Sequence, residues 1–291
     1  MRTYSPALRL PRKAALMARE ARYLARHPTE RKLIRDNDRF QGIHAGEDCF
    51  ILGNGPSLIE DDLSVLADDV VFTVNNLTAD DLGAGIYPRY HVLSDRRFFS
   101  LDPDSQVDAP MLATLRKIFV GDRSPVCFAP SSEAGFIRAH RLDTNGNVSY
   151  FCNPFYFSDY YVIRTDATRI IPRFCSVVQH AVLLAIHMGF QRIYLLGCDT
   201  TNIIANISAA LNDNADKYYA YEVSPELNAW FSAQFAKRTM ERCAESYLEV
   251  LIGFRFLWLY CVNTGVELVN CSSRSVVDSI PRRRLHDVRP N

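Results

Sequence analysis

The stretch "CFILGNGPSLIEDDL", residues 49–63, decides the fold. It begins with apolar residues typical of a buried strand, passes through Gly53-Asn54-Gly55-Pro56-Ser57 and ends in an acidic segment. Glycine lets backbone N–H groups come close to a ligand, and proline suits the first position of a helix, whose N-terminus favours anions. The pattern predicts a strand, a turn that could hold phosphate, and a helix from Ser57 onward.

Five later segments have the apolar and β-branched composition of strands. A helix over 176–189, capped by Ser176 and ended by Gly189, precedes one of them, and a second long helix is expected over about 226–263. Strands alternating with helices predict an α/β fold, a Rossmann-like and mostly parallel sheet with helices on both faces. The segments are "VVFTVN" (70–75), "YHVLSD" (90–95), "SPVCFAP" (124–130), "RIYLLG" (192–197) and "VELVNC" (266–271).

Composition and periodicity divide the chain into three parts. Residues 1–45 form a basic amphipathic helical extension whose Ala15, Met17 and Leu24 could pack on a domain. Residues 46–285 form the predicted Rossmann-like domain, and residues 286–291 a tail. Within the domain, polar stretches at about 131–170 and 201–228 predict lid-like loops.

Charge and cysteine usage narrow the class of protein. Lysine plus arginine and aspartate plus glutamate number 33 each, so no net field attracts nucleic acid. The eight cysteines contain no CxxC pair, and the histidines have no metal-ligand spacing, so we expect buried free thiols and no metal site. With no signal-like or membrane-spanning apolar run, we expect a cytoplasmic protein with at most peripheral contact to the inner membrane.

Four predicted strands end in glycine or polar residues, and ligands of open parallel sheets bind outside such carboxyl ends. Amides, hydroxyls and carboxylates there could hold a nucleotide or act as general bases. Tyrosines of the second loop could contact its phosphate. The candidate nucleotide-binding residues at the strand ends are Gly53, Asn54, Gly55, Pro56, Ser57, Asn75, Asn76, Ser94 and Gly197, and the candidate catalytic residues are Asp95, Asp199, Tyr219 and Tyr221.

Each candidate also has a purely structural interpretation. Asparagine and aspartate often end strands or cap helices, and glycine turns join strands to helices without any ligand. His180 and His187, on the apolar side of the predicted helix, fit buried and hydrogen-bonded histidines better than ligands. The binding interpretation depends on several polar strand ends occurring together.

The motifs "ILGNGPSL", "TVNN", "HVLSD", "SVVQHAVLLAIHMGFQRIYLLGCD" and "VELVNCSSRSVVDSIPR" resemble the bacterial branch of the 6-hydroxymethylpterin diphosphokinase MptE-like family. They are also similar to small bacterial sialyltransferases and motility-associated nonulosonate transferases. The resemblance covers about residues 46–285. It implies a nucleotide bound by the strand-end residues, with Ser176 as a further nucleotide-binding residue. In the sialyltransferases it also implies loop tyrosines that assist the leaving phosphate and a lid histidine that deprotonates the acceptor.

The sequence departs from the sialyltransferases in that loop. Thr201 stands where they have a tyrosine, and no histidine occurs between residues 188 and 285. Three hypotheses therefore follow: a glycosyltransferase of surface-polysaccharide synthesis using a nucleotide-activated sugar, such as a CMP-nonulosonate; a diphosphokinase using Mg²⁺ and ATP; and a non-catalytic nucleotide-binding protein. The expected partners are a nucleotide or nucleotide-sugar, a saccharide or lipid-linked saccharide acceptor, and a second copy of the chain.

Overall fold

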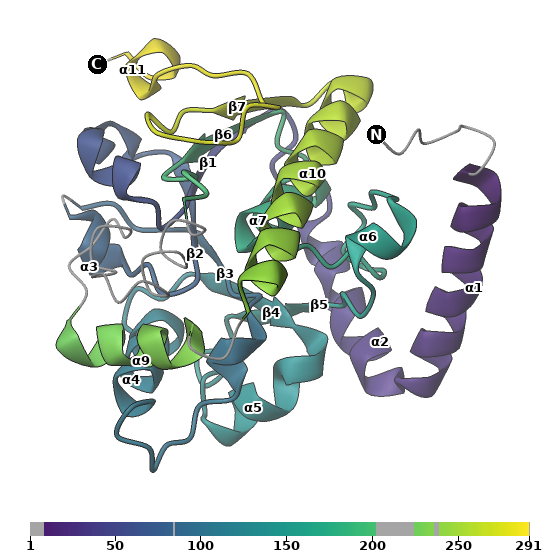
Figure 1. Ribbon diagram of the computed structural model, residues 1–291, viewed down its shortest axis with the longest axis horizontal. Helices are drawn as coiled ribbons and strands as arrows, with labels where there is room; N and C mark the ends of the chain where they lie inside the picture. The colour runs from purple at the N-terminus through teal and green to yellow at the C-terminus, as the bar shows by residue number, and fades with distance from the viewer. Residues whose placement is uncertain (1–8, 84, 202–223, 236–238, 291) are drawn as a thin grey trace.

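A seven-stranded sheet, parallel throughout, forms the centre of the molecule (Figure 1). The computed structural model describes residues 9–83, 85–201, 224–235 and 239–290. The strand order is β5-β4-β3-β2-β1-β6-β7. The strands are β1 (Asp48–Leu52), β2 (Val70–Val74), β3 (Tyr90–Val92), β4 (Val126–Pro130), β5 (Val148–Phe151), β6 (Arg192–Leu196) and β7 (Glu267–Asn270). This confirms the predicted α/β class.

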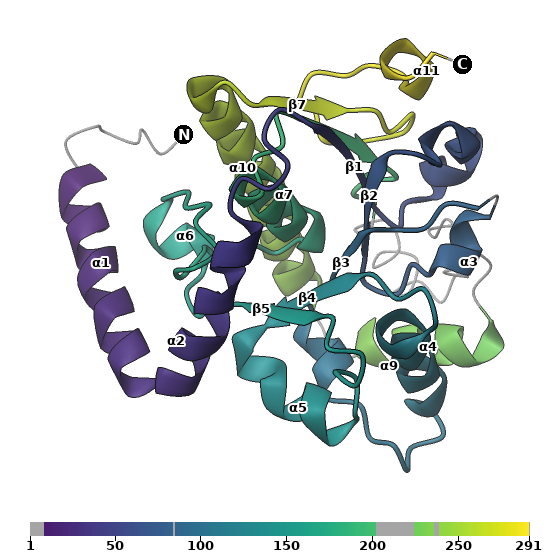
Figure 2. The ribbon, with the colours of Figure 1, turned by 180° about the vertical axis from the view of Figure 1, so that it is seen from behind.

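Helices cover both faces of this sheet and one of its edges (Figures 1 and 2). The α-helices are α1 (Arg9–Arg26), α2 (Pro28–Arg35), α3 (Ala79–Leu82), α4 (Ala109–Val120), α5 (Ala134–Ala139), α6 (Phe157–Tyr160), α7 (Val177–His187), α9 (Pro225–Phe235), α10 (Met240–Thr264) and α11 (Leu285–Val288). Short 3₁₀ helices are η2 (Asp36–Phe40), η3 (Pro56–Glu60), η4 (Leu63–Leu66), η5 (Arg96–Phe99) and η6 (Ser131–Glu133).

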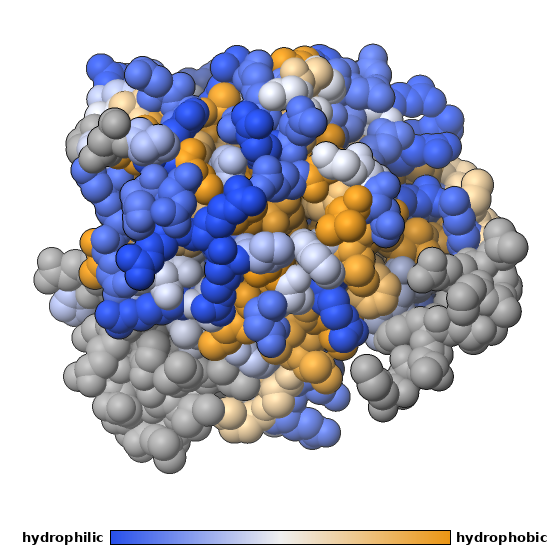
Figure 3. Space-filling view, turned by 90° about the horizontal axis from the view of Figure 1, so that it is seen from above, coloured by the Kyte–Doolittle hydropathy of each residue, from blue (hydrophilic) through white to orange (hydrophobic). Residues whose placement is uncertain are grey.

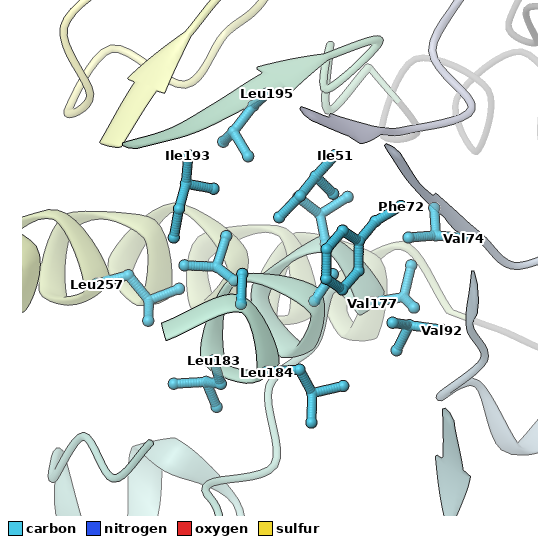
Figure 4. Close-up of a cluster of buried hydrophobic side chains, with 14 of the residues drawn as sticks. Ile51, Phe72, Val74, Val92, Val177, Leu183, Leu184, Ile193, Leu195 and Leu257 are labelled. Atoms are coloured by element: carbon cyan, nitrogen blue, oxygen red, sulfur yellow. The ribbon is translucent and has the colours of Figure 1, made fainter. Parts of the chain in front are cut away.

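The main core lies between the sheet and helices α7 and α10 (Figure 4). Ile51, Phe72 and Ile193 reach from the strands toward α7, and Leu257 joins from α10. Because α7 is buried on nearly all sides, its sequence is apolar all round rather than amphipathic. Each fully buried aliphatic side chain contributes about 1.5–3 kcal/mol to stability relative to an exposed one.

The opposite face of the sheet carries two further clusters. Alternate residues of a strand point to opposite faces, so Phe50 and Leu52 of β1 pack against η3, η4 and α3. Cys127 and Ala129 of β4 pack against α4 and α5 on the same side. Burial on both faces explains why the strands are continuous apolar runs.

The structure corrects three sequence predictions. Residues 57–67 form η3 and η4 rather than a continuous α-helix, because Asp62 accepts a hydrogen bond from the Ser64 N–H (3.0 Å) and starts a new turn. The predicted loop over 131–170 contains α5, the edge strand β5 and α6. The helix expected over about 226–263 is two helices, α9 and α10.

The basic N-terminal segment is packed against the sheet edge. The buried Asn37 donates its Nδ2 to the carbonyl of Tyr150 in β5 (2.7 Å), which covers part of an edge strand. In α1 Leu16 is buried and Leu24 packs partly buried against the same cluster, as predicted for Leu24, whereas Ala15 and Met17 are exposed, contrary to the prediction. At the other end of the chain, Leu285 is buried against the sheet.

The surface is mixed in polarity (Figure 3). Hydrophilic residues cover much of the face in that view, and apolar residues gather in a band across its middle. All eight cysteines lie among the described residues and form no disulfide, and Cys175 alone is exposed. Across the part of the chain that the structure describes, no helix has the length and hydropathy needed to cross a membrane.

Candidate functional site

The strand order reverses between β1 and β6. Strands β2 to β5 follow β1 on one side, whereas β6 returns to pair with its other side. At such a switch point, open α/β sheets bind their ligands outside the carboxyl ends of the two strands. Gly53 and Gly197 directly follow these strands, so the turn at residues 53–57 lies at the switch point.

The glycines at the switch point pack against one another. The Gly55 N–H donates to the Gly197 carbonyl (2.7 Å), and Gly197 has a positive φ of 58°. A Cβ atom on Gly53 or on Gly55 would lie 2.5 Å from the Gly197 oxygen, closer than real Cβ contacts. The glycines therefore permit the close approach of two chain segments, which is the structural interpretation of this motif.

Asp199 joins the two strand ends. Its Oδ2 accepts the Ser57 N–H (2.8 Å), and its Oδ1 accepts the Ser57 hydroxyl, so the carboxylate holds the start of η3. The side chain is fully buried, and burial raises its pKa while the Ser57 hydrogen bonds oppose that shift. Both oxygens are engaged, so action as a general base requires that these bonds break first.

Two asparagine amides line the neighbouring strand ends. Asn54 Nδ2 donates to Asn76 Oδ1 (3.1 Å), which links the turn after β1 to the turn after β2. The Oδ1 atoms of Asn54 and Asn75 are buried and have no hydrogen-bond partner among the described residues. Since a buried acceptor without a donor is costly, these two atoms are suited to accept hydrogen bonds from a ligand.

The backbone of Asn75 has an uncommon conformation, with φ at 55°. Its carbonyl accepts the His91 Nε2–H (2.9 Å), and the other ring nitrogen lies 2.9 Å from Thr73 Oγ1. Burial lowers the pKa of His91 to about 4, so the ring is neutral at pH 7. Sequence reasoning placed His91 in a strand and gave it no role, because its partner across the strands is not visible in the sequence.

Asp95 and Ser94 follow β3. Asp95 caps η5, where its Oδ1 accepts the Arg97 N–H (3.0 Å) and its Oδ2 accepts Arg97 Nε (2.9 Å). Ser94 is half-buried at the same strand end. The ion pair gives Asp95 a structural function and also places an arginine near the carboxyl edge of the sheet.

Helix α7 begins at the carboxyl edge. Its last residues lie at the opposite edge, where Gly46 N donates to the Gly189 carbonyl (3.3 Å) just before β1. Ser176 is the N-cap, as predicted, but its side chain makes no capping hydrogen bond. The positive end of the α7 dipole therefore points toward the ends of the strands that the helix covers.

The loop after β7 makes hydrogen bonds to the backbone of Cys198 at the switch point. The sequence analysis did not predict this function. Ser272 Oγ accepts the Cys198 N–H (2.8 Å), and Ser275 Oγ donates to the Cys198 carbonyl (2.8 Å). Asn270 Nδ2 in turn donates to Ser275 Oγ (3.0 Å). The serine-rich "CSSRS" after the last predicted strand was the available signal.

The remaining candidates lie outside this cluster. His180 and His187 are buried and hydrogen-bonded, in agreement with the structural interpretation, and burial lowers the pKa of His180 to about 3. Tyr219 and Tyr221 lie outside the described residues. Among the described residues, no group of three or more His, Cys, Asp or Glu side chains could hold a metal ion.

No protein-family model matches the chain, and no curated protein matches it. Among solved structures, the sialyltransferase CST-II with a trisaccharide acceptor and CMP is 15% identical, with a TM-score of 0.45 over 84% of this chain and 88% of that chain. The sialyltransferase CstII from Campylobacter jejuni with a substrate analogue, cytidine-5'-monophosphate, is 17% identical, with a TM-score of 0.44 over 82% and 85% of the two chains. Similarity at this level carries no conclusion about the activity of this chain.

Proposed function

We propose that the chain is a nucleotide-dependent transferase that binds its nucleotide at the switch point between β1 and β6. The observation that carries the proposal is the pair of buried Oδ1 atoms of Asn54 and Asn75, which have no described partner at the strand ends. Nucleotides supply the matching donors, because bases carry exocyclic amino groups and ribose carries hydroxyls.

Within this proposal the reaction is glycosyl transfer from a nucleotide-activated sugar in surface-polysaccharide or lipopolysaccharide synthesis. A CMP-nonulosonate is the first donor to test, and a saccharide or lipid-linked saccharide is the acceptor, on the strength of the motif resemblance of residues 46–285. The N-terminus of α7 would favour the departing phosphate, and Arg97 would add positive charge near the same edge. Membership of the MptE-like family and catalytic roles for Asp95, Asp199, Tyr219 and Tyr221 stay predictions.

One observation favours the non-catalytic alternative. Both carboxylates predicted to act as bases are engaged, Asp199 by Ser57 and Asp95 by Arg97. A protein that binds nucleotide without turnover would keep such contacts, whereas a transferase needs an accessible base. The diphosphokinase alternative needs Mg²⁺ to bridge the phosphates and is tested in the same experiment.

The test is thermal-shift measurement with CMP, CDP, UDP, GDP and ATP, each with and without Mg²⁺. A ligand that binds only the native state raises the melting temperature. We expect stabilisation in the wild type, a smaller shift in Asn54→Ala and Asn75→Ala, and an unchanged shift in Asn145→Ala, a control at an exposed amide in a loop. Stabilisation by CMP without Mg²⁺ supports the glycosyltransferase, and stabilisation by ATP only with Mg²⁺ supports the diphosphokinase.

Turnover separates binding from catalysis. The protein is incubated with the nucleotide-sugar and a saccharide acceptor, and release of the free nucleotide is followed by chromatography. Acceptor-dependent release supports a transferase. Binding without release supports the non-catalytic protein, and stabilisation by none of the nucleotides contradicts the proposal as a whole.

We also propose a cytoplasmic location with peripheral contact to an anionic membrane through α1 and α2. The acidic residues of these helices point inward: Glu20 pairs with Arg164 (2.7 Å), and Glu30 accepts Tyr23 and Ser131 hydroxyls. The outer surface is therefore basic, which suits anionic lipid. Exposed basic residues are Lys13, Arg19, Arg22, Arg26, Arg31, Lys32 and Arg35.

Vesicle sedimentation tests this contact. Phosphatidylglycerol vesicles should carry down the wild type, and pure phosphatidylcholine vesicles should not. Reversing the charge of Arg22 and Arg26 to glutamate should abolish sedimentation, while the same change at the exposed Arg116 of α4 should leave it unchanged. Equal sedimentation of all variants contradicts the contact.

A second copy of the chain is the partner that we propose for the exposed side of α10. Leu248, Leu259 and Val262 are 57%, 42% and 58% exposed on this helix. Exposed apolar side chains gathered on one element mark association surfaces. Light scattering coupled to size exclusion should show a dimer or higher oligomer that Leu259→Glu dissociates, and a monomeric wild type contradicts the assignment.

A further inference from the structure

We propose that His91 is a positioning residue that holds the Asn75 backbone in its left-handed conformation and so aims the Asn75 side chain at the ligand. The inference rests on the proposed function for its ligand, and it deepens that function by naming a residue on which the affinity of the site depends. His91 itself lies in β3 and is fully buried.

The hydrogen bonds fix the state of the ring. The Asn75 carbonyl can only accept, so the His91 Nε2 that lies 2.9 Å away must carry the proton. Because a neutral imidazole has one protonated nitrogen, Nδ1 is the acceptor and Thr73 Oγ1 donates to it across 2.9 Å. One series of hydrogen bonds therefore runs from the Thr73 hydroxyl in β2, through the His91 ring in β3, to the Asn75 carbonyl in the turn after β2.

The main chain of Asn75 is held on both sides by β3. Its N–H donates to the Val92 carbonyl (3.1 Å), and its carbonyl accepts from His91. With φ at 55°, the residue adopts a conformation that most side chains avoid and that asparagine tolerates better than most. The left-handed turn gives the Asn75 side chain a direction that an extended continuation of β2 would not give it.

Burying the polar imidazole of His91 among the hydrophobic side chains around β3 costs desolvation free energy. Its neighbours in β3, Tyr90 and Val92, and the nearby Phe119 ring, 6.3 Å away between centroids, belong to the hydrophobic core. A leucine would pack there without the desolvation cost of a polar group. The imidazole supplies what leucine cannot, a donor to the carbonyl of a residue that carries a buried and unpartnered Oδ1 at the candidate site.

The ligand group that Asn75 would receive is a hydrogen-bond donor. The Oδ1 atom can only accept, so the matching group is an amino group of a base or a hydroxyl of ribose or sugar. Phosphate oxygens do not fit this atom, because they accept as well. The inference thus assigns Asn75 to the nucleoside or sugar part of the ligand.

The first arm of the test needs no ligand. Carbon-13 chemical shifts of Asn75 Cα and Cβ report its backbone conformation in the wild type, His91→Gln, His91→Leu and His91→Phe. We expect the left-handed conformation in the wild type and in His91→Gln, whose amide can still donate, and its loss in His91→Leu. His91→Phe keeps an aromatic ring in the strand but cannot donate to the Asn75 carbonyl, so it is the second variant if His91→Leu does not fold, and the left-handed conformation should be lost there too.

The second arm measures affinity by calorimetry, with the nucleotide that gives the largest thermal shift. The loss of one well-oriented hydrogen bond corresponds to about tenfold in affinity, so His91→Leu should weaken binding by about that factor. His91→Gln should restore most of it. In the Asn75→Ala background, His91→Leu should have no further effect, because the group that it positions is gone. His187→Leu is the matched control. This buried histidine makes hydrogen bonds with Asn37 and Ala167, so the variant should lose stability without losing affinity for the nucleotide.

Two results overturn the inference. Retention of the left-handed Asn75 conformation in His91→Leu, or in His91→Phe if His91→Leu does not fold, refutes the positioning role whatever binds. If His91→Leu weakens nucleotide binding equally with and without the Asn75 side chain, His91 does not act on the ligand through Asn75, and the inference is refuted. Failure of every nucleotide to bind the wild type refutes the proposed function instead, and the first arm still decides the role of His91.

Discussion

Gly55→Ala tests the close contact at the switch point. Gly55 has φ −71° and ψ 146°, which alanine adopts without strain, so any effect comes from contacts alone. The added Cβ would lie 2.5 Å from the Gly197 oxygen and 2.6 Å from Asp199 Cγ. Relief of these overlaps must separate the two turns and weaken the Gly55–Gly197 hydrogen bond. Overpacking costs about 1–3 kcal/mol and a disrupted buried hydrogen bond about 1–3 kcal/mol, so we expect a loss of about 2–6 kcal/mol.

Urea unfolding followed by circular dichroism measures this loss, with Gly135→Ala as the matched control. Gly135 lies in α5, and a Cβ there would meet no atom within 4 Å. Alanine is the better helix former, so this variant should be stabilised by about 0.5–1 kcal/mol. If Gly55→Ala unfolds at the wild-type midpoint with an unchanged slope, the two turns are not in the contact that we describe.

Three further predictions concern stability. Burial lowers the pKa values of His91 and His180 to about 4 and about 3, so acid should protonate these rings in the unfolded chain before the folded one. The free energy of unfolding should therefore fall from about pH 6.5 downward, by about 3 kcal/mol for His91. His91→Gln should flatten this pH profile, and an unchanged profile contradicts burial of the neutral ring. Trp230→Phe removes the 3.0 Å indole bond to Asp108 and should cost about 1 kcal/mol in urea unfolding, and no change would mean that this bond is not formed. Gly253→Ala places a Cβ 2.4 Å from a buried amide of α7 and should cost about 1–3 kcal/mol, so a wild-type melting temperature argues against this packing of α10 on α7.

Apolar runs predicted the sheet well because both faces of it are buried. Six strands lie where such runs were predicted, and the seventh, β5, was missed. Its segment "VSYF" is short, and it follows "DTNGN", which has the composition of a loop. It becomes a strand because it pairs with β4 and because Asn37 of the N-terminal segment covers it. Tertiary contacts of this kind are not visible in local composition.

The sequence also located the strand-end residues but not their contacts. Asn54, Asn75 and Asn76 were chosen because amides follow strands, and the structure places Asn54 against Asn76. The pairing of Asp199 with Ser57 and of His91 with Asn75 joins residues far apart in the chain, so spacing could not predict it. Long-range contacts also explain the glycines. The sequence predicts that Gly53 and Gly55 let a ligand approach the backbone, whereas in the structure they let the turn at Gly197 approach.

The central claim is that a nucleotide binds between the carboxyl ends of β1 and β6. Hydrogen–deuterium exchange with and without each of CMP, UDP, GDP and ATP at millimolar concentration tests it most directly, because it maps protection onto the chain. We predict that at least one nucleotide slows exchange in peptides spanning 49–58, 70–77 and 192–201. Protection confined to other segments, or no protection by any of the four, would contradict the claim.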